Sequence, residues 1–126
     1  RDFLYGLLVA CVGERPLGLQ VSQLRAIVVM LRQQSSLPVE LHAVGRRLGL
    51  AATIAAALEP EGIAGLTLEG GLGSLREVLE ENVAVNDAPE LFCFGLLQEF
   101  DVPVIESLVA PRPITRLPLA TEPTPR

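Results

Sequence analysis

A pattern of strand, turn, helix and strand in the first half of the chain constrains the fold more than any other feature. Val39–Val44 alternates apolar and polar residues, as a half-buried strand does. The glycine-bounded turn Gly45–Gly49 leads into the alanine-rich run Leu50–Leu58, a strong helix former whose small side chains pack closely on a sheet. Ile63–Leu68 then has the character of a second strand. Strands joined through a helix form a right-handed parallel unit, so we expect an α/β fold with a parallel sheet and flanking helices.

One helix is expected before this unit and another after it. Between residues 15 and 34, Pro16 is followed by apolar residues three or four positions apart, which mark one face of a helix. Ser74 and Glu77 have the S-x-x-E spacing of a capping box, in which the serine oxygen accepts from a free helix amide and the glutamate reaches back to the cap. A helix should therefore begin at Ser74. The face of the first helix consists of Leu17, Val21, Leu24, Val28 and Leu31.

Two more helices and a third strand are expected toward the carboxyl end. Asp87 can cap a helix that has Pro89 in its first turn and runs to about Glu99. A short helix is expected over 101–108 and a third strand over 112–117, which makes the order α-β-α-β-α-α-α-β. We expect one domain over 1–117. Three of the ten prolines fall in 118–126, so this tail is expected to be extended or disordered.

The composition excludes several classes of partner. The net charge is -5 and there is no lysine, which argues against binding to the phosphates of a nucleic acid. The longest uncharged runs, 3–13 and 48–58, fall well short of the roughly 18 to 20 apolar residues of a membrane span. The chain is therefore interpreted as soluble, with no membrane and no nucleic-acid partner. Its first residues do not resemble a signal peptide, and the missing initial methionine suggests a fragment or a processed product.

The cysteines and the single histidine give no sign of a metal site. Cys11 and Cys93 are far apart in the sequence and lie among apolar residues, so we interpret them as buried free thiols. His42 has no neighbour at the spacing of metal ligands. No metal and no cofactor are predicted, and the cellular compartment is left open.

Three short blocks link the chain to a known family. Residues 68–74 read Leu-Glu-Gly-Gly-Leu-Gly-Ser, residues 86–91 read Asn-Asp-Ala-Pro-Glu-Leu, and residues 109–114 contain Ala-Pro-Arg-Pro, the most specific run. With these blocks the chain resembles the carboxyl-terminal half of α/β-hydrolases of the acetyl-xylan-esterase and dienelactone-hydrolase kind. The resemblance covers essentially the whole chain. It implies a partial three-layer α/β-hydrolase sandwich, and a parent enzyme that transfers the acyl group of a small ester to water.

The resemblance also places the nucleophile elbow, the G-x-S-x-G turn that lifts the catalytic serine above the sheet. Gly45 and Gly49 match its two glycines, and Arg47 occupies the place of the serine. Leu48 would supply the backbone amide of the oxyanion hole. Because arginine stays protonated and is no nucleophile, the elbow is expected to be degenerate.

The remaining members of the catalytic triad are not recognisable either. In this family the acid follows the strand that the Ala-Pro-Arg-Pro run precedes, and the histidine comes later still. Glu122 is the acid of that tail and hence a weak candidate for the role. His42 precedes the elbow, and on a strand it is interpreted as a structural residue. A complete set of serine, histidine and acid cannot be assembled.

Other residues suggest chemistry of their own, each with a structural alternative. Ser74 after the glycines of 70–73 could be a nucleophile on a flexible turn, or those amides could hold an anion, but helix capping explains Ser74 without a base. A carboxylate pair for acid/base or glycosidase chemistry is the functional alternative for four acids that we interpret as solvated helix starts, namely Glu69, Asp87, Glu90 and Asp101. A small anion-binding surface is the alternative for four arginines, Arg46, Arg47, Arg112 and Arg116.

Two hypotheses of function follow, and whether the chain is an enzyme stays open between them. The first is an α/β-hydrolase-fold protein related to carbohydrate and carboxyl esterases that lacks its own complete triad, as an inactive or truncated form. A small ester or a carbohydrate is its implied ligand. The second is a non-catalytic interaction or structural module, because a small parallel sheet leaves edges and faces to be covered. Its partner would be a second copy or a completing chain.

Overall fold

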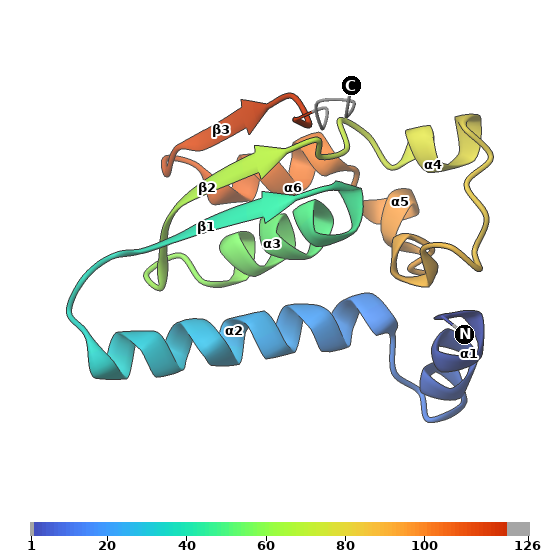
Figure 1. Ribbon diagram of the computed structural model, residues 1–126, viewed down its shortest axis with the longest axis horizontal. Helices are drawn as coiled ribbons and strands as arrows, with labels where there is room; N and C mark the ends of the chain where they lie inside the picture. The colour runs from blue at the N-terminus through green and yellow to red at the C-terminus, as the bar shows by residue number, and fades with distance from the viewer. Residues whose placement is uncertain (1, 121–126) are drawn as a thin grey trace, which may run out of the picture.

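The computed structural model of the protein describes residues 2–120 (Figure 1). The helices and strands alternate in its central part, and a series of short helices connects the second strand to the third. In chain order the elements are α1 (Asp2–Cys11), α2 (Pro16–Gln34), β1 (Val39–Val44), α3 (Arg46–Leu58), β2 (Ile63–Glu69), α4 (Arg76–Glu80), the 3-10 helix η1 (Pro89–Leu91), α5 (Leu96–Glu99), α6 (Val102–Val109) and β3 (Ile114–Leu117).

The strands of the described chain form one parallel sheet in the order β1-β2-β3. Leu41 of β1 is opposite Leu66 of β2, which is opposite Ile114 of β3. Each connection steps to the next strand in the same direction, and right-handed crossovers in one direction place their helices on one face. Accordingly, α3 and α6 lie on the same face of the sheet (Figure 1). The predicted α/β class, with a parallel sheet and flanking helices, is confirmed.

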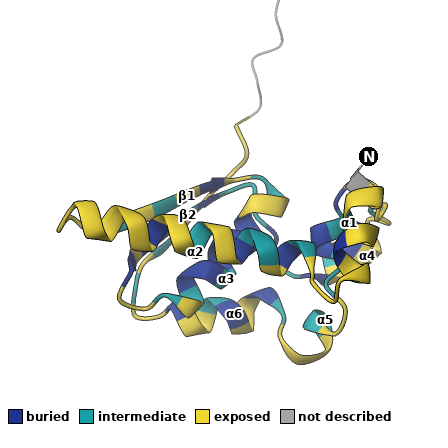
Figure 2. Cartoon of the chain, turned by 90° about the horizontal axis from the view of Figure 1, so that it is seen from below, coloured by how far each residue is buried: buried dark blue, intermediate teal, exposed yellow. Residues whose placement is uncertain are grey.

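The two faces of the sheet have different surroundings. Helix α2 runs along the β1 side of the molecule and packs on α3, while no helix of residues 2–120 covers the face opposite α3 and α6 (Figures 1 and 2). Side chains on that face alternate with the buried ones, so His42, Thr67 and Thr115 lie side by side there. We call this surface the open face; it comprises Glu40, His42, Val44, Thr67, Glu69, Thr115 and Leu117.

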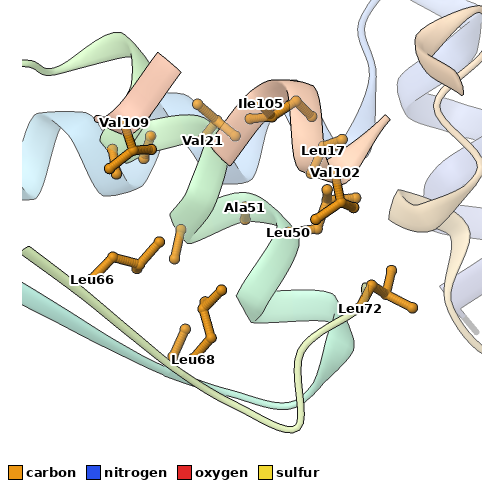
Figure 3. Close-up of a cluster of buried hydrophobic side chains, with 14 of the residues drawn as sticks. Leu17, Val21, Leu50, Ala51, Leu66, Leu68, Leu72, Val102, Ile105 and Val109 are labelled. Atoms are coloured by element: carbon orange, nitrogen blue, oxygen red, sulfur yellow. The ribbon is translucent and has the colours of Figure 1, made fainter. Parts of the chain in front are cut away.

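The hydrophobic core lies between the sheet and α3. Ala55 and Ala56 of α3 are fully shielded from solvent, and their small size lets the helix approach the strands closely. Leu66 and Leu68 of β2 contribute the sheet side of this core, and Val109 of α6 closes it (Figure 3). The alanine-rich run thus has the packing role expected from its composition.

Two of the predicted helices differ from the observed ones. Helix α3 starts at Arg46 and not at Leu50, because the turn after β1 needs only Gly45. The helix expected from Asp87 to Glu99 is interrupted, and that prediction is wrong: η1 ends at Leu91, and Gly95 has a positive φ of 80° before α5. Glycine tolerates this left-handed conformation, which ends helices and does not continue them.

Helix α1 was not expected from the sequence. Its apolar residues occur on every side, so no stripe of helical period marks one buried face. In the structure most of them are indeed exposed, for example Leu4, Leu8 and, just after the helix, Val12. Among the described residues, no helix is both long and apolar enough to cross a membrane.

Two further predictions concerned the burial of the cysteines and the extended carboxyl-terminal tail. Both thiols are free, but Cys11 is exposed, so its expected burial is wrong; Cys93 is partly buried, and burial raises the pKa of its thiol. In the tail, the amide of Ala120 donates to a carboxylate oxygen of Glu69 over 3.0 Å. The rest of the expected extended segment, including Glu122, lies outside the described residues.

Candidate functional site

The carboxyl ends of β1 and β2 lead through glycine turns into α3 and α4. Gly45 has φ 85° and ψ 166°, a conformation open only to glycine, and Gly70 has φ 65°. The amide of Gly45 donates to the carbonyl oxygen of Glu69 over 2.7 Å, which holds the two turns together. In α/β sheets, the loops at the carboxyl ends of the strands bring functional side chains together, so the candidate site is built from here.

Residues 39–58 form a strand, a tight turn and a helix, but the positive φ is not at position 47, which the resemblance assigns to the serine. Gly45 carries the positive φ, and Arg47 is already the second residue of α3. Gly49 lies against the next loop, since a Cβ on it would be 3.5 Å from the Cα of Gly71. Leu48 is exposed on the first turn of α3. The glycines therefore serve the turn and the contact between the two loops.

Arg47 is held by a carboxylate that is almost completely buried. Its guanidinium pairs with both carboxylate oxygens of Glu90, one of them at 3.1 Å, and Nη1 donates to the carbonyl oxygen of Asp87 over 3.0 Å. Glu90 is only 2% exposed. The interpretation of Glu90 as a solvated helix start is therefore wrong. A buried carboxylate requires a partner of opposite charge, and Arg47 provides it.

The four arginines do not assemble into an anion-binding surface. Arg46 pairs with Glu81, and the hydrogen bond between them raises the pKa of Arg46 and lowers the pKa of Glu81. Arg116 pairs with Glu106 and also donates to a backbone carbonyl. Arg112 donates to the carbonyl oxygen of Ile63 at the other end of the sheet. Each guanidinium therefore serves a different local structural contact.

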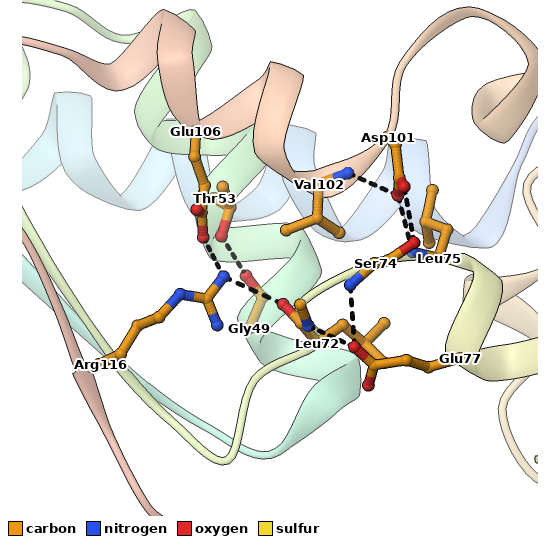
Figure 4. Close-up of polar contacts among 11 residues, drawn as sticks. Gly49, Thr53, Leu72, Ser74, Leu75, Glu77, Asp101, Val102, Glu106 and Arg116 are labelled. Atoms are coloured by element: carbon orange, nitrogen blue, oxygen red, sulfur yellow. Dashed lines mark hydrogen bonds and ion pairs between the residues drawn. The ribbon is translucent and has the colours of Figure 1, made fainter.

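Ser74 belongs to a network that caps two helices (Figure 4). Its Oγ accepts from the amide of Arg76 over 3.1 Å, and Glu77 accepts from the amide of Ser74 over 3.0 Å. The expected capping contacts are thus confirmed, although α4 starts at Arg76. Ser74 Oγ also donates to Asp101 over 2.6 Å.

Asp101 is the centre of this network. Its carboxylate accepts from the amides of Leu75 and Val102, each over 2.7 Å, and so caps α6 as the sequence indicated. Partial burial works to raise the pKa of Asp101, but the hydrogen bonds from Ser74, Leu75 and Val102 outweigh it and lower the pKa below its ordinary value of 3.8. The charged carboxylate is therefore a structural link between α4 and α6.

His42 lies on the open face, away from this network. Its Nε2 is 3.3 Å from a carboxylate oxygen of Glu69, and its side chain is about half exposed. No hydrogen bond within residues 2–120 joins it to a serine hydroxyl. In the same range, no group of three or more His, Cys, Asp or Glu side chains is placed to hold a metal ion.

Two hollows meet at Gln20 of α2. One, of about 400 Å³, lies at the elbow between Val44, Arg47 and Glu90. The other, of about 310 Å³, lies between α2, β1 and α3; we call it the β1 groove. Within the described chain, the Oε1 atom of Gln20 is shielded from solvent and receives no hydrogen bond. The β1 groove is lined mainly by apolar side chains, among them Leu24, Ile27, Leu41, Leu48 and Ala51.

Two residues of this region were missed from the sequence. Glu90 was interpreted as a solvated helix start, and its burial depends on Arg47, which is 43 residues away. Gln20 lies three residues after Leu17 and one before Val21, on the buried face of α2. A polar residue within an apolar stripe is the signal that could have identified it.

Together, the fold and the candidate site define a small α/β protein whose elbow-like turn carries a structural ion pair. Comparison with protein-family models, with curated proteins and with solved structures found no match for this chain.

Proposed function

We propose that the chain is an α/β-hydrolase-like domain, related to carbohydrate and carboxyl esterases, that does not hydrolyse esters by itself. One observation carries the proposal. Arg47, at the position that the resemblance assigns to the nucleophile, forms an ion pair with the buried Glu90 and a hydrogen bond to the carbonyl of Asp87. The side chain at this point stabilises the fold and offers no electron pair for attack on an acyl carbon.

The other requirements of acyl transfer support the same proposal. A serine nucleophile needs a histidine within hydrogen-bond reach, which in turn is oriented by an acid. Ser74 has the acid Asp101 but no imidazole, and His42 has the acid Glu69 but no serine. The pair of Ser74 and Asp101 links α4 to α6, whereas the pair of His42 and Glu69 lies on the open face of the sheet. Neither half-site provides a serine paired with an imidazole, and the Asp101 carboxylate is a poor general base because its hydrogen bonds lower its pKa.

Hydrolysis of p-nitrophenyl acetate tests the proposal. The wild-type chain is expected to match heat-denatured protein, and so is Arg47→Ser, because no base is aligned with position 47. The double variant Arg47→Ser with Glu90→Gln removes the unpaired carboxylate that the single change leaves, so an inactive result does not merely reflect misfolding. Wild-type activity that a serine-directed phosphonate abolishes, and that Ser74→Ala removes, would contradict the proposal.

The open face favours a second function, that of a non-catalytic module that assembles with itself or with another chain. Parallel sheets in globular proteins are normally covered on both faces, whereas His42 and Thr115 are exposed on one face of this sheet. Sedimentation velocity over a range of concentrations tests self-assembly. Thr115→Lys should weaken it, while Ser22→Lys, an exposed position on α2, serves as the control. Unchanged sedimentation of Thr115→Lys would exclude the open face as the contact.

A further inference from the structure

The β1 strand has an unpaired edge. A strand residue directs its N–H and C=O to the same side, and successive residues alternate between the two sides. The amide of Gly45 points to β2, where it binds the carbonyl of Glu69. The backbone groups of Glu40, His42 and Val44 therefore point away from β2. No strand of residues 2–120 pairs with them there.

The β1 groove runs beside this edge, on the side of α2 and α3. Leu41 and Ala43 of β1 form one wall, and Leu24 and Ile27 of α2 form the other. Ile27 is about half exposed, so apolar surface on this wall faces water. A strand added at the edge would direct every second side chain toward the helices, and hence into the groove.

A charged side chain beside the groove bears on the chemistry of such a strand. Glu40 is exposed on the open face and makes no ion pair within the described chain. A strand with basic residues on its open-face side would complement this charge, since opposite charges on neighbouring strands stabilise a sheet.

We propose that the edge of β1 binds an extended segment of another protein as an additional strand. Apolar side chains at alternate positions fill the β1 groove, and an arginine or lysine between them faces Glu40. Main-chain hydrogen bonds to Glu40, His42 and Val44 provide much of the affinity, and the groove provides the specificity. This inference rests on the second proposed function, that of an assembly module, and assigns it a partner and a surface other than the open face.

Fluorescence anisotropy with a labelled, acetylated seven-residue peptide of alternating lysine and valine is the test. Two control peptides carry N-methyl groups, one on all valines and the other on all lysines. In a strand, one of these sets faces β1 and the other faces solvent. We expect one methylated peptide to lose binding and its isomer to retain it. Equal binding of both isomers would overturn the proposal in favour of a simple apolar ligand.

Protein variants test the edge directly. His42→Pro removes an outward N–H and leaves the ladder between β1 and β2 intact, because proline is tolerated at such edge positions. His42→Ala removes the imidazole but keeps the N–H. We expect His42→Pro to bind the peptide about fivefold more weakly, the effect of one lost hydrogen bond, and His42→Ala to bind as the wild type does. Circular dichroism verifies that both variants fold.

The groove is tested separately on exposed positions of α2, where folding is not at risk. Ile27→Glu places a charge on the groove wall, and Val29→Glu places the same charge at an equally exposed position outside it. Only Ile27→Glu should weaken binding of the peptide.

Two results would overturn the proposal: binding of the peptide by His42→Pro as tight as by the wild type, or no binding of the peptide by the wild type. Self-assembly that persists in His42→Pro without peptide binding would leave the second function standing and exclude the edge.

Discussion

Glu90 is the buried partner in the ion pair at the start of α3. Its carboxylate is buried under the first turn of α3, where Arg47 is its partner. The N-terminus of a helix is unfavourable for cations, and carboxylates from later in the chain offset this for both Arg46 and Arg47. Position 90 is 43 residues from position 47, so the pair could not be derived from local spacing.

Loss of Glu90 should therefore destabilise the fold. Glu90→Ala removes a buried carboxylate that accepts hydrogen bonds from Arg47, whose own side chain is 45% exposed and can be hydrated in the variant, so we expect a loss of about 1 to 3 kcal/mol. Urea denaturation followed by circular dichroism measures the change in the free energy of unfolding. Glu81→Ala is the matched control, because it removes the exposed partner of Arg46, and its effect should be much smaller. Equal effects of the two changes would contradict the structural role of Glu90.

At the scale of the elements, local signals determined most of what was predicted correctly. The bounds of β1 agree with the predicted Val39–Val44, because alternation of apolar and polar residues is a local pattern. Helix α2 begins at Pro16, and Asp101 caps α6, for equally local reasons. The burial of Glu90 depends on its pairing with the distant Arg47 and was therefore not visible in the sequence. Gly95, in contrast, is a local helix-ending signal, and the predicted helix ran through it.

The turn between β1 and α3 should tolerate only glycine. Gly45→Ala forces a side chain into a conformation with φ near 85°, which costs roughly 1 to 3 kcal/mol. Gly18→Ala is the control, and its effect on the free energy of unfolding should have the opposite sign. Gly18 lies inside α2 with space for a Cβ, so alanine there should stabilise the fold by about 1 kcal/mol. Thermal unfolding of both variants measures the two effects, and a neutral Gly45→Ala would refute the assigned turn geometry.

The link between α4 and α6 should depend on pH. Because the folded state lowers the pKa of Asp101, its contribution to stability is complete above the ordinary value of 3.8 and is lost as the pH falls through the lower, folded value. Wild type should therefore lose more stability than Asp101→Asn on acidification below pH 3.8. Denaturant unfolding of both at pH 7 and at lower pH measures this difference. Glu61→Gln, at an exposed position, should follow the wild type; parallel curves for wild type and Asp101→Asn would contradict the assignment.

At the scale of the whole molecule, stability is unevenly distributed. Residues of α3 are buried between the sheet, α2 and α6, whereas most apolar side chains of α1 are exposed (Figure 2). Regions with few buried contacts open most easily. Hydrogen exchange should accordingly be fast for the amides of α1 and slowest for those of α3 and β2. Equal protection of α1 and α3 would mean that α1 is covered in solution, for example by a second copy.

The strands lie in the sheet in the same order as in the chain, which has a consequence for folding during translation. Each strand pairs with the one made just before it, so the pairing of β1 with β2 needs nothing from the residues after Glu69. Domains begin to fold while the ribosome is still extending them, and contacts between nearby segments form first. We therefore expect β1, α3 and β2 to associate on the nascent chain, with β3 joining an edge that is already in place.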